Sequence, residues 1–352
     1  MASSKVYYAA NAGIHGLKFV GQIRYTIGAS LDKFIKNLFE GPRPEGFMVD
    51  LTEVETIEIP AADVDNQQNT NIDNPTLDIP QTFPVRDGDV LTLVWSDEFS
   101  DSALDPELWF YESGDGTQYG IPSPSFGNNE LQYYLPDNVR LADGTLQITA
   151  RRESARGYNI TSGRIMTRDR FAFTYGRIEA RIKLPAGQGT WPAFWMLPQA
   201  DEPNAAPGFG TYGEYAQSGE IDIVEAVNLK GTPGPGGVGG GNEIFSTIHF
   251  GGTPASGQKL QSETRYTPGE DVTAGFNVYA FEWDPFEMRW FFNGVLYKME
   301  NSWSSTGGPF PAPFDKPFYV LFNLAVGGNF PGPLANDALP ATMEVDWVRV
   351  YS

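Results

Sequence analysis

Three carboxylates lie within six residues of one another, in the run Glu220-Ile221-Asp222-Ile223-Val224-Glu225. Side chains alternate between the faces of a regular strand, so Glu220 and Asp222 would share one face and Glu225 would lie on the other. One extra residue after Asp222, a β-bulge, turns Glu225 back to the face of Glu220 and Asp222. Acids crowded on one face destabilise a sheet, and the run holds no Lys or Arg to neutralise them. We therefore expect this strand to do chemistry rather than to support a core.

Paired carboxylates of this kind can break a glycosidic bond. Two Glu side chains that lean toward each other can bring their carboxyls to about 5–5.5 Å, the separation that retaining glycosidases use. One carboxylate then attacks the sugar carbon, while the other protonates the leaving oxygen and later activates water. Asp222 can hydrogen-bond the nucleophile and, by like-charge coupling, help to keep the acid protonated near neutral pH. A solvated strand and a calcium ligand set are the alternatives, although EF-hand-like loops carry Gly and polar spacers instead of Ile and Val.

Five further segments carry motifs of one enzyme family. They are Val94-Trp95-Ser96-Asp97-Glu98-Phe99, Asn128-Asn129-Glu130-Leu131-Gln132-Tyr133-Tyr134, Phe173-Thr174-Tyr175-Gly176-Arg177-Ile178-Glu179-Ala180-Arg181, Trp191-Pro192-Ala193-Phe194-Trp195-Met196-Leu197-Pro198 and Glu344-Val345-Asp346-Trp347-Val348-Arg349-Val350-Tyr351. Together with the acidic run, they make residues 89–352 resemble glycoside hydrolase family 16, in the laminarinase-like branch with the extra residue. The resemblance implies that Glu220 is the nucleophile, Asp222 its helper and Glu225 the acid/base.

The same resemblance supplies candidates for sugar binding. Trp191 and Trp195 are four residues apart, so a regular strand puts both on one face, where they would form a stacking floor for glucose units. Core packing is the alternative for one of them, but the matching pair in laminarinases lines the glycone subsites. His249 occupies a position that is a histidine near the acid/base in the family, whereas a lone strand histidine is usually only a satisfied polar group.

Three more candidates rest on the resemblance alone. It offers Asn128 and Arg164 as hydrogen-bond donors to sugar hydroxyls, and for each an ordinary loop or strand-end polar residue is the alternative. Phe330 stands where laminarinases usually carry Trp, so that end of the cleft is expected to bind more weakly.

Many relatives bind one structural calcium on the convex side of the fold. The matching positions here are Glu98, the Gly144 carbonyl and Asp346, and oxygen ligands from distant strands would suit calcium. Asp346 is equally well explained as a strand-end acid. We expect no cofactor for catalysis.

Charge and composition narrow the range of partners. The 352-residue chain has a formal net charge of −20, which argues against binding nucleic acid or sulfated polysaccharides and mildly favours a neutral polymer. Simple solubility explains the charge equally well. Aromatic residues make up 14% of the chain, as carbohydrate clefts and β-sandwich cores both require, and the absence of Cys excludes disulfides and thiolate metal sites.

Residues 89–352 read as many short strands between Gly, Pro, Asn and Asp. Residues 145–150 and 177–183 alternate with period two, and Asn293-Gly294 after the aromatic stretch 289–292 predicts a hairpin. This pattern predicts a mainly β fold, an antiparallel sandwich, and the resemblance implies a β jelly roll with an open concave cleft. Loops 200–218 and 231–242 flank the acidic strand and either wall the cleft or are ordinary surface loops.

Residues 1–59 differ in kind. A strand within 16–26, a helix over 30–39 and a strand within 46–51 make a β-α-β unit that resembles the first half of a STAS domain, the anti-sigma factor antagonist fold. The family's phosphorylatable serine is replaced by Glu58-Ile59-Pro60. Such a partial α/β segment exposes strand edges, so it would dock on the sandwich or self-associate. Residues 60–88, rich in Pro, Asn, Asp and Gln, read as a linker.

No apolar stretch is long enough to cross a membrane, so no membrane partner is expected. The resemblance implies an extracellular enzyme, yet Met1–Tyr8 shows no apolar region typical of a signal peptide.

We therefore expect an endo-acting retaining β-glucanase that cuts β-1,3 links in laminarin-like glucans. The alternatives are a mixed-linkage β-1,3-1,4-glucanase and a non-catalytic glucan-binding protein. A STAS-type signalling protein with a carbohydrate-sensing sandwich is disfavoured by the missing serine.

Overall fold

The structure, a computed structural model, describes residues 6–12, 17–23, 49–50, 80–84, 90–121, 125–202 and 205–352. The chain forms two compact units, one of Met1–Ile79 with Val85–Asp89, the other of Pro80–Pro84 with Val90–Ser352.

The described part of the first unit is a small sheet. Strand β1 (Val6–Ala12) pairs antiparallel with β2 (Leu17–Ile23) and, on its other side, with β3 (Val49–Asp50). Strands β2 and β3 fall within the two stretches predicted as strands. The helix predicted over 30–39 lies outside the described residues, so the STAS resemblance stays a prediction.

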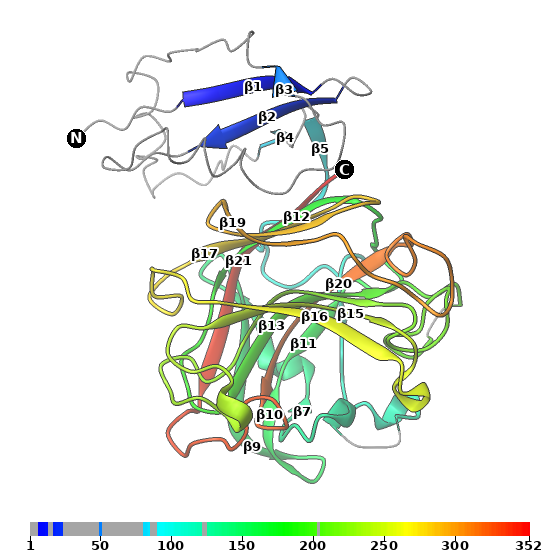
Figure 1. Cartoon of the computed structure of the whole chain (residues 1–352). Coiled ribbons are helices and arrows are strands. Elements are labelled where there is room, and N and C mark those ends of the chain that lie inside the picture. Colours follow the sequence, from blue (N-terminus) through cyan, green and yellow to red (C-terminus); the bar gives the residue numbers. More distant parts are fainter. Residues whose placement is uncertain are drawn as a thin grey trace, which may run out of the picture. The chain divides into compact units, whose positions relative to one another are not determined.

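The second unit is a sandwich of two β-sheets (Figure 1). The larger sheet comprises β4 (Thr82–Pro84), β5 (Val90–Asp97), β7 (Tyr133–Tyr134), β8 (Val139–Ala142), β9 (Thr145–Ala155), β10 (Tyr158–Ser162), β12 (Gly176–Lys183), β17 (Asn277–Trp283), β18 (Met288–Phe292), β19 (Val295–Glu300) and β21 (Ala341–Tyr351). The seven-stranded sheet comprises, in spatial order, β16 (Lys259–Tyr266), β15 (Ile244–Gly251), β14 (Glu220–Ala226), β13 (Thr190–Pro198), β20 (Phe318–Val326), β11 (Arg164–Met166) and β6 (Phe110–Tyr111).

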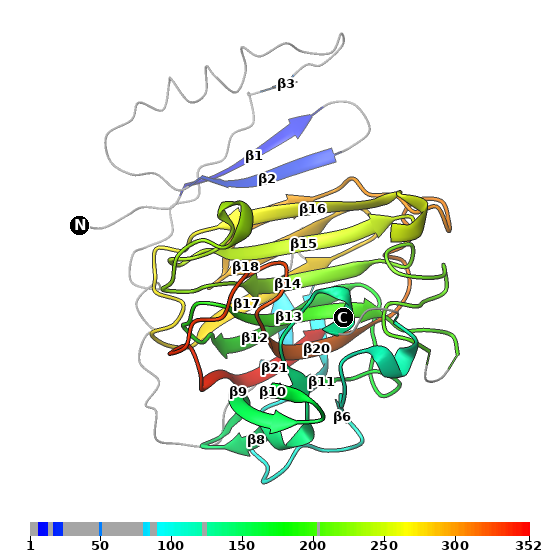
Figure 2. The same ribbon diagram turned by 90° about the horizontal axis from the view of Figure 1, so that it is seen from below.

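Figure 2 shows β16, β15, β14 and β13 side by side, with β14 near the middle of its sheet. Among the described residues the helical segments are single 3₁₀ turns. They are Thr117–Tyr119, Ser125–Gly127, Pro136–Asn138, Pro235–Gly237 and Pro254–Ser256. The prediction of a mainly β sandwich is therefore confirmed.

Local sequence explains the hairpin between β18 and β19. Its two turn residues, Asn293 and Gly294, both have positive φ angles, 47° and 76°. This is the backbone that the right-handed twist of paired strands requires in a two-residue turn, and Asn-Gly adopts it readily. The predicted hairpin is confirmed.

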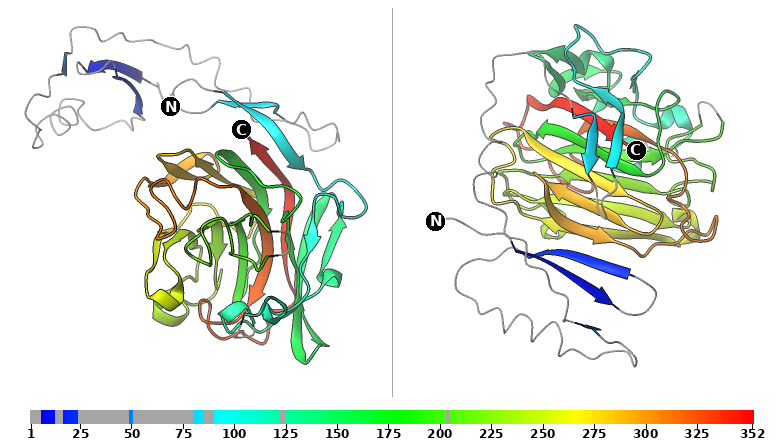
Figure 3. Two further views of the ribbon diagram at one scale, coloured as in Figure 1. Left: turned by 90° about the vertical axis from the view of Figure 1, so that its right-hand side faces the viewer. Right: turned by 90° about the horizontal axis from the view of Figure 1, so that it is seen from above.

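Apolar side chains of the two sheets form a common core. Phe194 and Met196 from β13 and Ile221 from β14 belong to one buried cluster with Phe281 of β17 and Trp290 of β18. In Figure 3 (left) the two sheets appear as layers, with orange β20 in one and red β21 in the other. This packing presses β14 against the opposite sheet and leaves its other face for polar side chains.

The sandwich begins before residue 89. Strand β4 pairs with β5, and β5 pairs with β21, so the hairpin extends the larger sheet (Figure 3). The Arg177 guanidinium lies over the ring of Phe83 in β4, 3.9 Å from the centroid of that ring. The Phe83 ring also contacts the ring of Tyr351. Pro80–Pro84 therefore belong to the sandwich, although we expected a linker over 60–88.

No helix in the described part of the chain has the length and apolar character that crossing a membrane requires.

Candidate active site

All three carboxylates of β14 point to the same face of the seven-stranded sheet. They are opposite alternate residues of β15, namely Glu220 with His249, Asp222 with Thr247 and Glu225 with Phe245. Alternate residues of one strand share a face, and directly opposed residues of antiparallel strands share a face too. We call this side of the sheet the carboxylate face.

A bulge in β14 produces this arrangement. Between Asp222 and Glu225 the strand advances three residues while β15 and β13 each advance two, and Ile223 has no partner in either register. Ile223 and Val224, although consecutive, both lie in the core. The extra residue thus turns Glu225 back to the side of Asp222, in the way that the spacing predicts.

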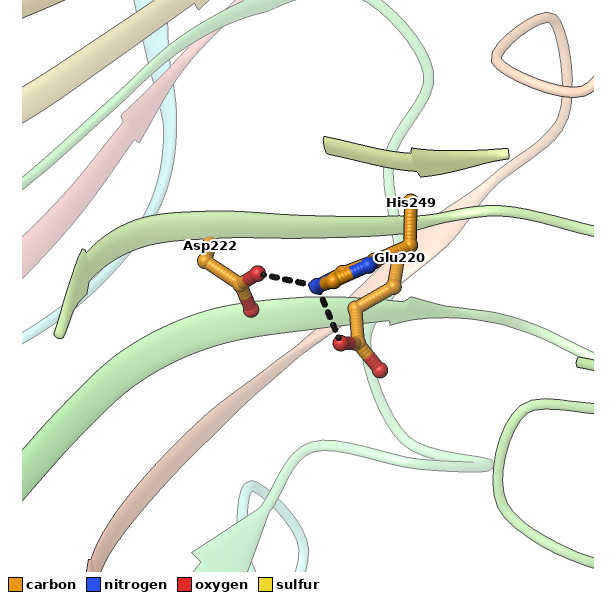
Figure 4. Close-up of side chains that lie close together, drawn as sticks. All are labelled: Glu220, Asp222 and His249. Atoms are coloured by element: carbon orange, nitrogen blue, oxygen red, sulfur yellow. Dashed lines mark ion pairs between the residues drawn. The ribbon is translucent and has the colours of Figure 1, made fainter. Parts of the chain in front are cut away.

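His249 lies beside two of the acids (Figure 4). Its Nε2 atom is 3.4 Å from Glu220 Oε1 and 3.3 Å from Asp222 Oδ2. Within the described residues, His249 Nδ1 has no hydrogen-bond partner. Burial lowers the pKa of His249, against the opposing effect of the Glu220 charge, so the imidazole is neutral near pH 7.

Burial raises the pKa of each acid. The pKa of Glu220 rises to about 8, through desolvation and then the charge of Asp222. The pKa of Asp222 rises to about 7 through desolvation, although Lys298 and Lys259 oppose the rise. Desolvation and the Asp222 charge raise the pKa of Glu225 well above its usual range. Three like charges cannot coexist in one buried site, so the cluster holds at least one proton near pH 7.

The two tryptophans of β13 make different contacts. Trp191 donates its indole N–H to Glu225 Oε1 at 2.8 Å, whereas Trp195 donates to Asn323 Oδ1 at 2.7 Å. Both side chains are half-buried, as residues of the carboxylate face. Trp191 therefore directly orients a carboxylate, a contact that the expectation of a stacking floor did not include.

Arg164 lies further across the same face. Pairings link it through Asn323 of β20 and Ala193 of β13 to Glu225, which places it three strands, roughly 14 Å, from that acid. Its guanidinium lies between two rings, 4.5 Å from the centroid of Phe126 and 4.9 Å from that of Trp195. The structure thus brings Arg164 and Trp195 together, as a charged wall beside an aromatic surface.

Asn128 donates to the buried carboxylate of Glu130 at 3.0 Å, and Gln132 donates to the same group. The Asn128 amide is thereby held in one orientation. Glu130 and Gln132 belong to the segment 128–134, in which the sequence pattern assigned neither of them a role. The signal that could have identified them is their position as two polar residues shortly after the loop residue Asn128.

Phe330 packs against two aromatic residues of the carboxylate face. Its ring packs edge-on against Trp191, with centroids 5.3 Å apart, and against Phe245, with centroids 5.1 Å apart. Phe330 is therefore adjacent to the tryptophan that contacts Glu225.

Tyr215 and Lys259 are site residues that the sequence did not single out. Burial, followed by the charges of Glu220, Asp222 and Glu225, raises the pKa of Tyr215, and the ring centroid of Tyr215 is 6.1 Å from that of His249. Lys259, at the start of edge strand β16, holds its ammonium 4.8 Å from the Tyr215 ring centroid. Tyr215 belongs to loop 200–218, so the position of that loop before the acidic strand was the available signal.

Both predicted loops lie against the site region. The end of loop 200–218 places Tyr215 beside His249, the residue of β15 opposite Glu220. Loop 231–242 lies against the segment after β20, since Gly234 is close to Pro331 and Pro235 is close to Gly332, and it lines a pocket of about 430 Å³ with Gln188 and Leu334. The three acids do not line this pocket.

The predicted calcium ligands have other partners. Glu98 forms a two-bond ion pair with Arg349, at 3.0 and 2.8 Å, and Asp346 pairs with Arg181. Because a guanidinium already neutralises each carboxylate, calcium would have to displace an arginine from both. The residues as they lie do not favour calcium.

Comparisons with known proteins agree with this geometry. A family profile described as "Beta-porphyranase A-D, GH16 domain" matches residues 90–352. The chain is 39% identical over 308 residues to the glucan endo-1,3-beta-glucosidase A1 of Niallia circulans, covering 83% of this chain and 41% of that relative. It is 40% identical over 276 residues to the beta-glucanase of Rhodothermus marinus, covering 74% of this chain and 84% of the relative.

The fold matches solved structures as well. The endo-beta-1,3-glucanase of Pyrococcus furiosus superposes with a TM-score of 0.62 at 34% identity, covering 78% of this chain and 98% of that one. The profile match extends over well above half of the chain, and the two relatives just described are named a glucan endo-1,3-beta-glucosidase and a beta-glucanase. The chain therefore belongs to glycoside hydrolase family 16, with a laminarinase-like glycoside hydrolase domain over residues 90–352.

Proposed function

We propose that the protein is an endo-acting β-glucanase that hydrolyses β-1,3-glucosidic links in laminarin-like glucans with retention of configuration. The observation that carries the proposal is the bulged strand β14, which puts Glu220, Asp222 and Glu225 on one face. The names of the relatives from Niallia circulans and Rhodothermus marinus supply the substrate class.

In the first half of the proposed reaction Glu225 holds the proton of the cluster, and an oxygen of the ionised Glu220 attacks the anomeric carbon and forms a glycosyl ester. The bond to the leaving glucan breaks as Glu225 gives its proton to the departing oxygen. Burial and the Asp222 charge keep the pKa of Glu225 high, which favours the protonated acid. Trp191, which donates to Glu225 Oε1, holds that carboxyl in place.

In the second half, Glu225 is a carboxylate and takes a proton from water. The hydroxide attacks the anomeric carbon from the side that the leaving group vacated, and Glu220 departs as a carboxylate. Asp222 and His249 lie next to Glu220, so they orient it and share the change of charge between the two steps.

We propose further that the glycone part of the glucan lies over Trp195 and Arg164, with Asn128 at its far end. Phe330 would lie beside Trp191, the residue that contacts Glu225. The position of the Arg164 guanidinium over the Phe126 and Trp195 rings supports this proposal, because sugar rings stack on aromatic planes while a guanidinium donates to hydroxyls.

Porphyran is a second candidate substrate, because the description of the family profile names a β-porphyranase. A mixed-linkage β-1,3-1,4-glucan remains the nearest alternative among glucans. A non-catalytic glucan-binding role is disfavoured by the presence of all three acids.

Product analysis on laminarin, lichenan, porphyran, agarose and xyloglucan tests the proposal, with Glu220→Gln as the inactive variant. We expect oligosaccharides from laminarin first, and a loss of about 10⁴-fold or more in kcat for Glu220→Gln with laminarin binding retained. Turnover by Glu220→Gln at the parental rate contradicts the mechanism, whereas a preference for porphyran contradicts only the substrate. Glu153→Gln, at an exposed strand position, is the matched control.

The structural calcium at Glu98, Gly144 and Asp346 and the STAS-like origin of residues 1–59 stay predictions. A variant that begins at Pro80 keeps strand β4 and is expected to retain activity, which tests whether the sandwich needs residues 1–79.

A further inference from the structure

The bulge in β14 leaves backbone groups that the sheet ladder does not pair. Ile223 has no partner in either neighbouring strand, and it lies in the core, away from water. A buried carbonyl without a donor destabilises the fold, so side chains must supply donors if the bulge is to persist.

Two side chains supply them. Ser246 Oγ, on β15, donates to Ile223 O at 2.8 Å, and Trp290 Nε1, on β18 of the opposite sheet, donates to Asp222 O at 3.0 Å. Ser246 and Trp290 are both fully buried. The two carbonyls at the bulge are thus fastened from two directions, one within the sheet and one across the core.

A further layer fixes these two donors. Tyr297 OH lies 2.5 Å from Ser246 Oγ, and because the serine proton already goes to Ile223 O, the tyrosine must donate to Ser246. Lys298 Nζ donates to Ser246 O at 3.0 Å and lies 4.3 Å from the centroid of the Trp290 ring. Tyr297 and Lys298 are neighbours on β19, so one strand of the opposite sheet braces both donors.

The alternative to the bulge is a regular strand. A regular strand would put Val224 on the carboxylate face and turn the Glu225 side chain into the core, because a slip of one residue reverses every later side chain. By stabilising the bulge, the donors to Asp222 O and Ile223 O therefore help to set the position of Glu225, the acid of the proposed reaction, relative to Glu220.

We propose that Trp290 and Ser246 are positioning residues that hold the bulge of β14 and, through it, the placement of Glu225. This inference rests on the proposed function. Neither residue touches substrate in the proposed complex, since both lie between the sheets. Their effect on the reaction passes through the backbone of Asp222 and Ile223.

Trp290→Phe tests the inference, because it removes the indole N–H and keeps an aromatic ring in the core. The matched control is Trp283→Phe, since Trp283 is equally buried on β17 and donates to a carbonyl away from β14, Phe314 O at 2.9 Å. We expect both variants to lower the melting temperature by similar amounts. Only Trp290→Phe is expected to lower kcat on laminarin, by about 10- to 100-fold with KM little changed, because a small misplacement of a catalytic group is costly.

Leaving-group dependence separates positioning from general damage. A misplaced Glu225 impairs protonation of a sugar leaving group, whereas a dinitrophenolate departs without a proton. The activity to compare is kcat/KM, which reports the first half of the reaction and excludes the later role of Glu225 as base. Trp290→Phe is therefore expected to lose far more activity on laminarin than on a dinitrophenyl β-laminaribioside, and Ser246→Ala is expected to show the same selectivity. Ser246→Ala carries the test by itself if Trp290→Phe does not fold.

Equal losses on both substrates, or equal losses in kcat for Trp290→Phe and Trp283→Phe, overturn the inference. Parental kcat in both Trp290→Phe and Ser246→Ala does so too. If the parent protein cleaves neither substrate, or if Glu220→Gln remains active, the proposed function itself fails. The two failures are therefore distinguishable.

Discussion

Each sheet of the sandwich carries a cluster of buried acids, and the two clusters differ in what neutralises them. On the larger sheet, Glu282 pairs with Arg177 at 2.8 Å and with Arg289 at 3.0 Å, while Glu179 pairs with the same Arg177 at 2.7 Å. Cross-strand registers place these side chains opposite one another, so acids and bases alternate across β12, β17 and β18.

On the carboxylate face, Glu220, Asp222 and Glu225 have a neutral histidine and a tryptophan as close partners. Lys298 lowers the pKa of Asp222 and Lys259 lowers the pKa of all three acids, but within the described residues the ion pairs of these acids involve His249 alone. Buried charges that are paired stabilise a fold, whereas buried acids left without cations store repulsion that a reaction can use. The contrast indicates that pairing, more than burial or residue type, distinguishes the acids of the larger sheet from the acids proposed to be catalytic.

The largest expected effect is that of a substitution on the carboxylate face. Glu225→Gln removes the proposed acid and is expected to lower kcat on laminarin by about 10²–10⁴-fold, with unfolding stability at pH 7 little changed because the amide replaces a carboxyl that is already uncharged. Steady-state kinetics and urea unfolding measure the two quantities. Unchanged turnover would remove Glu225 from the mechanism.

The opposite pattern is expected on the larger sheet. Glu282→Gln leaves Arg177 and Arg289 short of a buried partner and is expected to cost about 3 kcal/mol in the free energy of unfolding. The kcat of the folded protein is expected to stay at the parental value. A variant that loses activity while keeping its stability would show that the two clusters are coupled.

The pH dependence of stability gives a third comparison. The pKa of Glu220 is raised to about 8, so the folded protein holds a proton that the unfolded chain releases above its ordinary pKa. The stability that this proton on Glu220 contributes is present in full below the ordinary pKa of Glu and is lost as the pH rises toward 8. Relative to Glu220→Gln, the parent should lose about 2–3 kcal/mol of stability between pH 5 and pH 8, as measured by urea unfolding. Parallel profiles for the two proteins would contradict the raised pKa.

The smallest expected effect concerns calcium. Since Arg349 and Arg181 already neutralise Glu98 and Asp346, millimolar calcium is expected to stabilise the EDTA-treated protein by less than about 1 kcal/mol. Thermal unfolding with and without calcium measures this. A larger gain that disappears in Asp346→Asn would instead support the predicted ligand set.

Much of the site follows from local sequence. The spacing of Glu220, Asp222 and Glu225 requires a bulge if all three are to share a face, and the register confirms it. The Asn293-Gly294 turn and the alternating strands are local as well. Backbone periodicity and turn conformation depend on neighbours in the chain, and therefore they can be read without knowing the fold.

Contacts between distant segments could not be predicted in this way. The sequence placed Trp191 and Trp195 on one face, but only the packing showed that Trp191 donates to Glu225 while Trp195 donates to Asn323, 128 residues away. The arginine partners of Glu98 and Asp346 likewise come from cross-strand pairing.

The sequence by itself determined which residues supply the acids and that the strand holding them must be irregular. The tertiary structure decided what keeps that irregularity in place, since Trp290 donates to Asp222 O from 68 residues further along the chain and from the opposite sheet. The physical reason is that an unpaired carbonyl in a core needs a donor, and the donor is chosen by how the two sheets pack rather than by its position in the sequence.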